Sequence, residues 1–328
     1  MSRNFQDLNH TGPPSRSAVL KENARRSVSV VISTKNRDSI GDSVRSVLAS
    51  EGIDIELIVV DQSECAGTGS TLDLVDDDRL VILRSVTSGV SCGRNIGLRA
   101  ASHEIVLIID DDVTVPEDWA RRFHAAVSSA EKVAVAFCRV DPGEHDIQLG
   151  FIPDHAVGEL RVVRSLMTKS LARGIGAGMA VRRKHVLSIG GFDELLGPGA
   201  RLRSAEDRDL AARVLAAGWW VLQTPDAVVL HHGFRTWEQG RGLTRRDWYG
   251  IGAAYAKQLK CRNLGILPVI AHEVLWFGLI KPVFYFATGR RYNGLRRIGY
   301  FVEGLVVGLR IPVDPCTMLY VDDEAAAP

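Results

Sequence analysis

Three consecutive carboxylates, Asp110, Asp111 and Asp112, directly follow the apolar run Ile105–Ile109. A short unbroken apolar run is typical of a strand that is buried on both faces of a sheet. Two carboxylates about 4 Å apart repel each other by roughly 4 kcal/mol at an effective dielectric constant near 20. A divalent cation that prefers oxygen ligands, such as Mg²⁺ or Mn²⁺, removes this repulsion and takes further ligands from water and phosphate. The motif therefore predicts a metal and diphosphate site at the end of a central strand.

A simpler interpretation of the same residues is a solvated acidic turn ahead of a helix. Pro116, Glu117 and Asp118 look like a helix start, and acidic residues there interact favourably with the helix dipole. We favour the metal site because the apolar run places Asp110 at the end of a buried strand. Ligands of open α/β sheets bind at such strand ends.

A second acidic cluster heads the helix predicted at Ala205–Ala217. It contains Glu206, Asp207 and Asp209, and Gly218 ends the helix. Acidic residues in a first helical turn are ordinarily partners of the helix dipole. The cluster therefore acquires a chemical role only if the fold brings it to the carboxylates of the first cluster.

Strand and helix patterns alternate through the first half of the chain. Strands are predicted at Val28–Ser33, Glu56–Asp61, Leu80–Arg84 and Ile105–Asp110, with a helix at Gly89–Ala101 before the last of them. This spacing argues for parallel β-α-β units with right-handed crossovers. Thr34, Asp61 and Asp110 should then meet in one crevice at the carboxyl edge of an α/β sheet.

The dinucleotide-binding class is excluded by the loop after the first strand. Nicotinamide-binding domains carry G-x-G-x-x-G at this point. Here the loop reads Ser33–Arg37 without glycine, and the run Gly174–Gly178 comes too late in the chain.

The pattern in the second half is mixed. Further strands are predicted at Val133–Val140, Gly178–Arg182, Trp220–Thr224 and Ala227–Leu230, and the last is followed by His231 and His232. The irregular stretch Asp141–Ser170 is expected to form a mobile insertion over the site.

Composition limits the compartment and the partners. The 40 Lys and Arg residues nearly balance the 39 Asp and Glu residues, which argues against nonspecific binding of nucleic acid. The five cysteines are scattered without a C-x-x-C pair, as expected for reduced thiols in a cytoplasm. Residues 1–26 are polar, lack the apolar region of a signal peptide and are predicted to be a disordered leader.

Six short segments stand in a characteristic order along residues 27–232. They are the S-T-K-N-R loop Ser33–Arg37, the I-V-V-D strand end at Asp61, Gly89–Gly97, the triplet Asp110–Asp112, Gly190–Glu194 and the pair Glu206 and Asp207. In this order they resemble glycosyltransferase family 2, whose members are inverting enzymes with the GT-A fold. The resemblance implies a mostly parallel, twisted sheet flanked by helices in a catalytic domain at residues 27–243.

The resemblance also implies a role for each matching residue. Those expected to bind the nucleotide are Thr34, Asn36, Arg37, Asp61, Arg94, Asp110 and Asp111. Asp112 is expected to hold the metal, with His231 as a further ligand. Asp207 matches the catalytic base, and Glu206 is expected to orient either the acceptor or Asp207.

This assignment gives each residue type a chemical task. An inverting transfer is one in-line displacement at the anomeric carbon, so a carboxylate must take the proton of the attacking hydroxyl. The departing nucleoside diphosphate needs a cation to stabilise its charge. The expected donor is a UDP-, GDP- or dTDP-sugar, and the expected acceptor is a saccharide or a lipid-linked precursor of a cell-surface polysaccharide or glycolipid.

Two other functions are weighed against this one. A nucleotidyltransferase also places acidic residues and metal on an α/β sheet, but it would need a basic, glycine-rich loop after the first strand, and none is visible. A catalytically inactive nucleotide-sugar-binding protein would not need both Asp112 and Asp207.

Residues 244–328 are predicted to be a helical C-terminal region. The apolar stretch Leu264–Ala287 is interrupted by His272, Glu273 and Lys281 and by two prolines, which argues against a transmembrane span. Basic residues flank it at Arg290, Arg291, Arg296, Arg297 and Arg310. Two interpretations remain open: contact with an anionic membrane surface, which would place the chain peripherally on the inner face of the cell membrane, and packing on protein.

Overall fold

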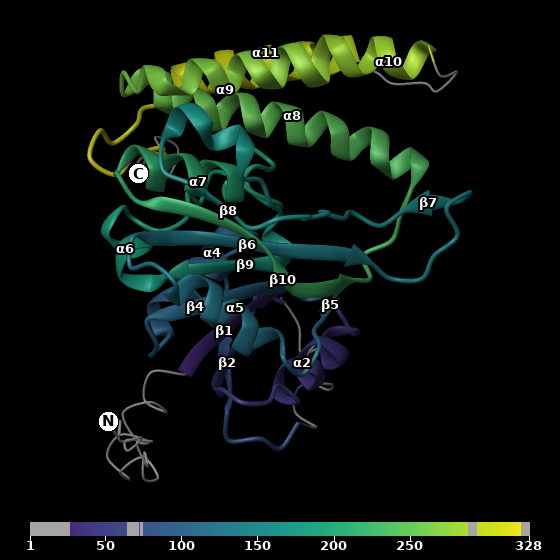
Figure 1. Cartoon of the computed structure of the whole chain (residues 1–328), viewed down its shortest axis with the longest axis vertical. Helices are drawn as coiled ribbons and strands as arrows, with labels where there is room; N and C mark the ends of the chain where they lie inside the picture. Colours follow the sequence, from purple (N-terminus) through teal and green to yellow (C-terminus); the bar gives the residue numbers. More distant parts are fainter. Residues whose placement is uncertain (1–26, 64–71, 73–74, 288–293, 323–328) are drawn as a thin grey trace, which may run out of the picture.

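The computed structural model describes residues 27–63, 72, 75–287 and 294–322, and it contains a twisted sheet with helices on both faces (Figure 1). The expected leader at residues 1–26 and the flanking Arg290 and Arg291 lie outside the described residues. The main sheet has the strand order β3-β2-β1-β4-β9-β6-β10-β5, with β8 pairing to β10. The α/β architecture predicted from the sequence is confirmed.

Three parallel strand pairings bring the carboxyl ends of four strands to the same edge of the sheet. The strands are β1 (Ser27–Thr34), β2 (Asp54–Asp61), β3 (Leu80–Arg84) and β4 (Ile105–Asp110). β1 pairs with β2 on one side and β4 on the other, so that Thr34 lies opposite Asp61 and Ser33 lies opposite Asp110. The three strand ends therefore lie side by side, as the pattern of apolar runs predicts.

The second half adds antiparallel pairing. Its strands are β5 (Val113–Thr114), β6 (Val133–Pro142), β7 (Gly150–Phe151), β8 (Arg161–Val163), β9 (Met179–Arg182), β10 (Trp220–His231) and β11 (Arg235–Thr236). β9 runs antiparallel between β4 and β6. The two strands expected around Pro225 form one strand, β10, whose register shifts between Thr224 and Val228 because proline has no N–H for the ladder.

The sheet is covered by one hydrophobic core on each face. The helices before the C-terminal region are α2 (Ile40–Leu48), α4 (Val90–Ala100), α5 (Trp119–Ser128), α6 (Arg183–Ser188) and α7 (Glu206–Ala216), with short 3₁₀ turns η1 (Leu166–Leu171) and η2 (Gly176–Gly178). α2 and α5 bury one face against Val30 and Ile32, whereas α4 and α7 bury the other against Val31. Neighbouring residues of β1 thus serve opposite cores, which explains the unbroken apolar run.

Helix α4 lies unusually close to the sheet. A Cβ added to Gly97 would come within 2.4 Å of the Val31 side chain, and one added to Gly93 within 2.6 Å of Ser33 Cβ. These two glycines bring the helix down onto β1. The close approach places Arg94, which stands between them, at the end of the sheet.

The C-terminal region forms an outer layer of helices on the α7 side of the sheet (Figure 1). Its elements are α8 (Trp237–Lys260), η3 (Leu264–Ile266), α9 (Leu267–His272), the π-helical turn η4 (Glu273–Ile280), α10 (Lys281–Ala287) and α11 (Gly294–Arg310). α8 begins seven residues before the predicted Thr244. A capping box fixes this start, because Thr236 accepts a hydrogen bond from the Gln239 N–H while the Gln239 side chain bonds back to Thr236.

The segment Leu264–Phe284 is 21 residues long, with a mean hydropathy of 1.5, and by length and composition alone it could cross a membrane. Only 22% of its apolar window is buried. Its buried residues include Ile266, Val269 and Glu273, and the last of these forms ion pairs with Arg173 at 2.8 Å and Arg208 at 3.2 Å. One side of this segment is therefore attached to the rest of the fold by apolar packing and by ion pairs.

Candidate active site

A cavity of about 460 Å³ opens at the carboxyl edge of the sheet, where β1, β4 and β10 end. Eight of the residues predicted from the sequence line it: Thr34, Arg37, Arg94, Asp110, Asp111, Asp112, Glu206 and His231. The volume is in the range of small-molecule sites in proteins. Residues from both acidic clusters, almost 100 positions apart, thus share one cavity.

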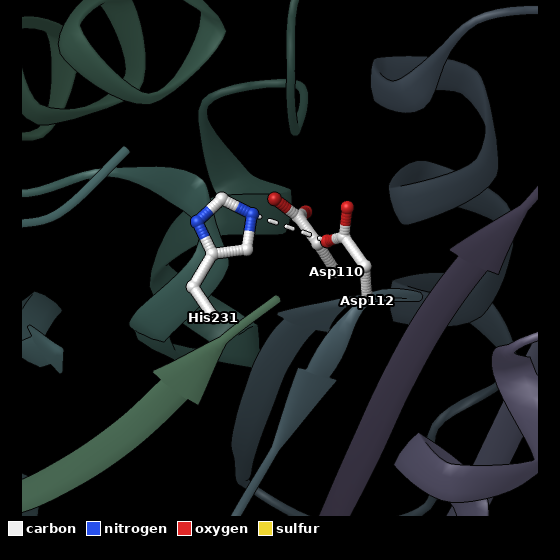
Figure 2. A group of neighbouring side chains, drawn as sticks. All are labelled: Asp110, Asp112 and His231. Carbon is white, nitrogen blue, oxygen red and sulfur yellow. Dashed lines mark ion pairs between the residues drawn. The ribbon is translucent and has the colours of Figure 1, made fainter. Parts of the chain in front are cut away.

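The two outer aspartates of the triplet face His231, which stands at the end of β10 (Figure 2). One ligand atom from each of Asp110, Asp112 and His231 lies within 4.8 Å of the others. His231 Nε2 is 3.2 Å from Asp112 Oδ1. Its Nδ1 is 2.7 Å from the carbonyl oxygen of Pro153, which orients the ring and directs Nε2 into the site.

The charges of this group are coupled. Burial would raise the pKa of Asp112, but the hydrogen bond and charge of His231, with Arg37 and Arg235, hold it below its ordinary value. Burial would lower the pKa of His231, yet Asp112 and the Pro153 carbonyl raise it. The pair therefore favours the carboxylate and the imidazolium in the absence of another cation.

These residues fit a divalent cation. Two carboxylates and one imidazole are a donor set that first-row divalent ions accept. The space between them depends on Gly233, because a Cβ there would lie 2.5 Å from Asp112 Oδ2 and 2.7 Å from His231 Nε2. Asp110, Asp112 and His231 would hold the ion.

Asp111 points away from this group and joins the first loop. Its Oδ2 accepts a hydrogen bond from Thr34 Oγ1 at 2.7 Å, and Arg37 Nε lies 2.8 Å from Oδ1. Arg37 also reaches Asp112 Oδ2 at 3.1 Å. Burial raises the pKa of Asp111 to about 6 although Arg37 and Thr34 oppose the shift. The triplet thus ties the S-T-K-N-R loop to the end of β4.

Arg94 connects the two acidic clusters. Its side chain is 2% exposed, Nη2 lies 2.8 Å from Asp110 Oδ1, and Nη1 lies 2.8 Å from Glu206 Oε1. Burial alone would lower the pKa of Arg94, but Asp110, Glu206 and Asp207 raise it. Gly176 makes room for this guanidinium, since a Cβ there would lie 2.4 Å from Nη2.

Asp207 is beside the cavity but is not among the residues that line it. It is 9% exposed, and its Oδ1 accepts a hydrogen bond from the Arg208 N–H at 2.6 Å. Its charge acts on Arg94 and Glu206. Burial is the main reason why the pKa of Glu206 is raised, and the charge of Asp207 adds to this rise. Ala205, just before α7, has φ of 74°, a left-handed conformation that non-glycine residues rarely adopt and that often marks functional sites.

Two of the predicted nucleotide-binding residues do not line the cavity. Asp61 is 2% exposed and its Oδ1 accepts the Ser63 N–H at 3.0 Å. Asn36 has a positive φ of 53° and donates its N–H to Ser63 Oγ at 2.8 Å. Both residues shape the adjoining loops, and their contact with a nucleotide stays a prediction.

The sequence analysis missed several residues of the cavity. Gln62 donates to the carbonyl oxygens of Thr87 at 2.9 Å and Gly89 at 3.1 Å and braces the loop before α4. Pro153 comes from the insertion Asp141–Ser170, and Asp247 comes from α8. Gln62 directly follows a predicted strand end, a signal that could have been used. Nothing in the sequence singles out Asp247 among the charges of α8.

The family comparison agrees with this arrangement. Residues 29–187 match the model of glycosyl transferase family 2. This range begins in β1 and ends in α6, so it includes the Asp110–Asp112 triplet and Arg94 but not Glu206 or Asp207.

Curated relatives are moderately similar. The chain is 27% identical over 252 residues to the pre-mycofactocin glycosyltransferase of Mycobacterium tuberculosis, an alignment that covers 75% of this chain and 49% of that protein. It is 31% identical over 108 residues to the succinoglycan biosynthesis protein ExoO of Rhizobium meliloti, covering 32% of this chain and 31% of that one. The chain therefore spans about half the length, or less, of these relatives.

Solved structures share the fold. The mannosyltransferase PcManGT of Pyrobaculum calidifontis, in complex with GDP-Man and Mn²⁺, superposes with a TM-score of 0.56 at 18% identity and covers 86% of this chain and 87% of that one. Residues 1–349 of TarS from S. aureus, in complex with UDP, give a TM-score of 0.51 at 16% identity, covering 85% and 81%. Residues 29–187 thus belong to glycosyltransferase family 2, and the chain has the GT-A fold.

Proposed function

We propose that this chain transfers a sugar, with inversion and with the help of a divalent metal ion, from a nucleotide-diphosphate donor to a hydroxyl group. The observation that carries the proposal is the shared cavity, which is lined both by Asp112 and by Glu206, the residue next to Asp207. A family 2 chain with both groups in place has the parts that a single displacement needs.

In this proposal the nucleotide-sugar donor binds at the carboxyl edge of the sheet. The nucleotide lies against Thr34 and Arg37, and Asp110, Asp112 and His231 bind the ion. When bound, the ion supplies positive charge for the diphosphate oxygens. The mixed oxygen and nitrogen donor set favours Mn²⁺ over Mg²⁺. GDP-Man and UDP, bound by proteins of the same fold, support donors of this class.

The reaction is one in-line step. The acceptor oxygen forms a bond to the anomeric carbon while the bond from that carbon to the diphosphate oxygen breaks, and the acceptor proton passes to Asp207. The nucleoside diphosphate departs with the bonding electrons. Arg94 holds Glu206 and Asp110 in fixed positions, and Glu206 orients Asp207 or the acceptor.

The product is a glycosidic bond in a saccharide or lipid-linked molecule of the cell surface. The support is the name of one relative, a succinoglycan biosynthesis protein. The other relative acts on a different kind of acceptor, a pre-mycofactocin. We place the chain in the cytoplasm or peripherally on the inner membrane face.

The exposed side of the C-terminal helices supports membrane contact. Along Leu264–Phe284, the large exposed side chains are all apolar: Leu264, Leu267, Leu275, Trp276, Leu279, Ile280, Val283 and Phe284. We call this row the apolar strip. Exposed basic residues lie at Arg262, Arg296 and Arg310. An apolar strip in a helical region that also exposes basic residues suits the surface of an anionic membrane, in which the helix lies in the plane.

The activity is tested by release of nucleoside diphosphate from UDP-, GDP- and dTDP-sugars with Mn²⁺, Mg²⁺ or EDTA. We expect slow, metal-dependent hydrolysis of one donor, with water in place of the acceptor, and ¹H NMR of the fresh product should show the inverted anomer. A retained anomer contradicts the inverting step. Donor binding without any turnover, with water or with a saccharide mixture, identifies an inactive nucleotide-sugar-binding protein instead.

A further inference from the structure

A second cavity, of about 450 Å³, adjoins the catalytic one at the start of the helical layer. Its lining includes Phe151, Trp237, Arg241, Asp247, Arg296 and Arg297. Pro153, Leu243 and Asp247 line both cavities. The two spaces therefore adjoin at these residues, and we call the second one the side groove.

One wall of the side groove is aromatic. Trp237 is 52% exposed, stacks on Phe151 with ring centroids 5.3 Å apart, and donates from Nε1 to the Gln148 carbonyl oxygen at 3.1 Å. Gly240 allows this packing, because a Cβ there would lie 2.6 Å from the Phe151 ring. Pairing of β7 with β11 and the capping box at Thr236 hold the indole in place. The result is a fixed, exposed ring that can take the apolar face of a sugar.

The lining of the groove is also basic. Arg241 and Arg296 are exposed and form no ion pair within the part of the chain that the structure describes. Arg297 lies over the Trp248 ring, 5.7 Å from its centroid. Against these three guanidinium groups the lining contains one carboxylate, that of Asp247. The groove thus attracts anions, and arginine suits carboxylate and phosphate groups in particular.

Asp247 stands where the groove meets the catalytic cavity. Its side chain is accessible from the two cavities and is otherwise surrounded by protein. Its Oδ1 accepts a hydrogen bond from Ser204 Oγ at 2.8 Å. Burial, with the nearby charge of Asp207, raises its pKa although Ser204 and Arg208 oppose the shift. Because Asp247 lines the same cavity as Glu206, the junction lies in the cavity beside the residue that precedes the proposed catalytic base.

We propose that the side groove is the acceptor site and that it selects a sugar ring bearing a carboxylate or a phosphate. The ring stacks on Trp237, the anionic group pairs with Arg241 and Arg296, and a hydroxyl reaches the catalytic cavity past Asp247. This inference rests on the proposed transferase function and names the acceptor class that function would use.

Ligand-observed NMR titrations with three probes test the selection: methyl β-glucuronide, glucose 1-phosphate and the neutral methyl β-glucoside. We expect both charged probes to bind the wild type about tenfold more tightly than the neutral one, as two charge-assisted contacts allow. The double variant Arg241→Gln/Arg296→Gln should lose this advantage. Trp237→Ala should weaken all three probes. Preference for one charged probe alone tells a carboxylate acceptor from a phosphate acceptor.

The matched control is Arg45→Gln, which removes an exposed arginine on α2 that pairs with Asp42. Its probe affinities should equal those of the wild type. Any of three results overturns the proposal. The wild type could bind charged and neutral probes equally, it could fail to bind the charged probes, or the preference for charged probes could survive in the double variant. Thermal shifts of the wild type with nucleotide sugars report the transferase function separately, so failure of one proposal is not mistaken for failure of the other.

Discussion

The Arg94 guanidinium lies 2.8 Å from the Glu206 carboxylate, and 112 positions of the chain separate the two residues. The same guanidinium holds Asp110 at 2.8 Å. A residue of α4 thus fixes the start of α7 relative to the end of β4. This contact is what gives the acidic first turn of α7 a place at the cavity rather than only a partner in the helix dipole.

Loss of Arg94 should destabilise the fold. In Arg94→Gln, Asp110 and Glu206 lose their shared cation while Glu206 stays buried, and breaking a buried ion pair typically costs about 3–5 kcal/mol. Because Asp110 is partly exposed, we expect a free energy of unfolding lower by about 3 kcal/mol. Urea unfolding measures it. The control Arg99→Gln removes an exposed arginine of the same helix. A loss of similar size in this control would show that the ion pairs of Arg94 contribute no more to the free energy of unfolding than a surface arginine does.

Removal of the proposed base should stop transfer without removing the donor. In Asp207→Asn the side chain keeps its shape but cannot accept the hydroxyl proton, and general-base catalysis is worth about 10²–10⁴-fold in rate. We expect a loss of that size in turnover and unchanged affinity for the nucleotide sugar, measured by titration calorimetry. Activity within threefold of wild type would mean that Asp207 is only a charge at the helix end.

Stability should rise between pH 8 and pH 10 because of Lys169. This residue is 4% exposed, and burial, assisted by the charges of Arg208 and Arg173, lowers its pKa from 10.5 to about 8. Between these values the unfolded chain binds one proton more than the folded chain, so the free energy of unfolding increases with pH. The gain, roughly 2–3 kcal/mol, should be absent in Lys169→Met.

Urea unfolding of both proteins at pH 7.5, 8.5 and 9.5 measures this gain, because other titrating groups affect the two chains alike. The difference in free energy of unfolding between wild type and Lys169→Met should move in favour of the wild type as pH rises. A difference that stays constant over this range would show that Lys169 keeps its proton in the folded state.

The apolar strip should bind anionic vesicles. Trp276 and Leu279 are 45% and 42% exposed, so Trp276→Asp/Leu279→Asp should abolish co-sedimentation with phosphatidylglycerol vesicles while the melting temperature changes little. Leu160→Asp, on an exposed apolar residue outside the strip, is the matched control. Full recovery of the wild type in the supernatant at low salt would leave packing against protein as the role of this surface.

The strand ends could be predicted from the sequence because each is marked locally. An apolar run that stops at Asp61 or Asp110 predicts a buried strand and the residue at which it ends. Right-handed crossovers then bring these strand ends together. The start of α8 was also readable, since Thr236 and Gln239 form a capping box, but the helix was predicted only from Thr244.

The partners of the charged residues could not be predicted. Arg94 lines the cavity, and its contact with a nucleotide stays a prediction, whereas its hydrogen bonds to two carboxylates distant in sequence were not predicted. Asp247 and Pro153 reach the cavity through the fold of α8 and of the insertion. Such contacts depend on tertiary geometry, on which helical periodicity and composition carry no information.

We propose above all that Asp112 and Asp207 serve one cavity, Asp112 acting on the donor and Asp207, beside the lining residue Glu206, acting on the acceptor. It is tested most directly by thermal-shift titration of the wild type, Asp112→Asn and Asp207→Asn with UDP-, GDP- and dTDP-sugars, each with and without Mn²⁺. The account predicts a Mn²⁺-dependent shift with one donor that Asp207→Asn keeps and Asp112→Asn loses. A donor shift that does not depend on Mn²⁺, or one that Asp112→Asn retains in full, would contradict it.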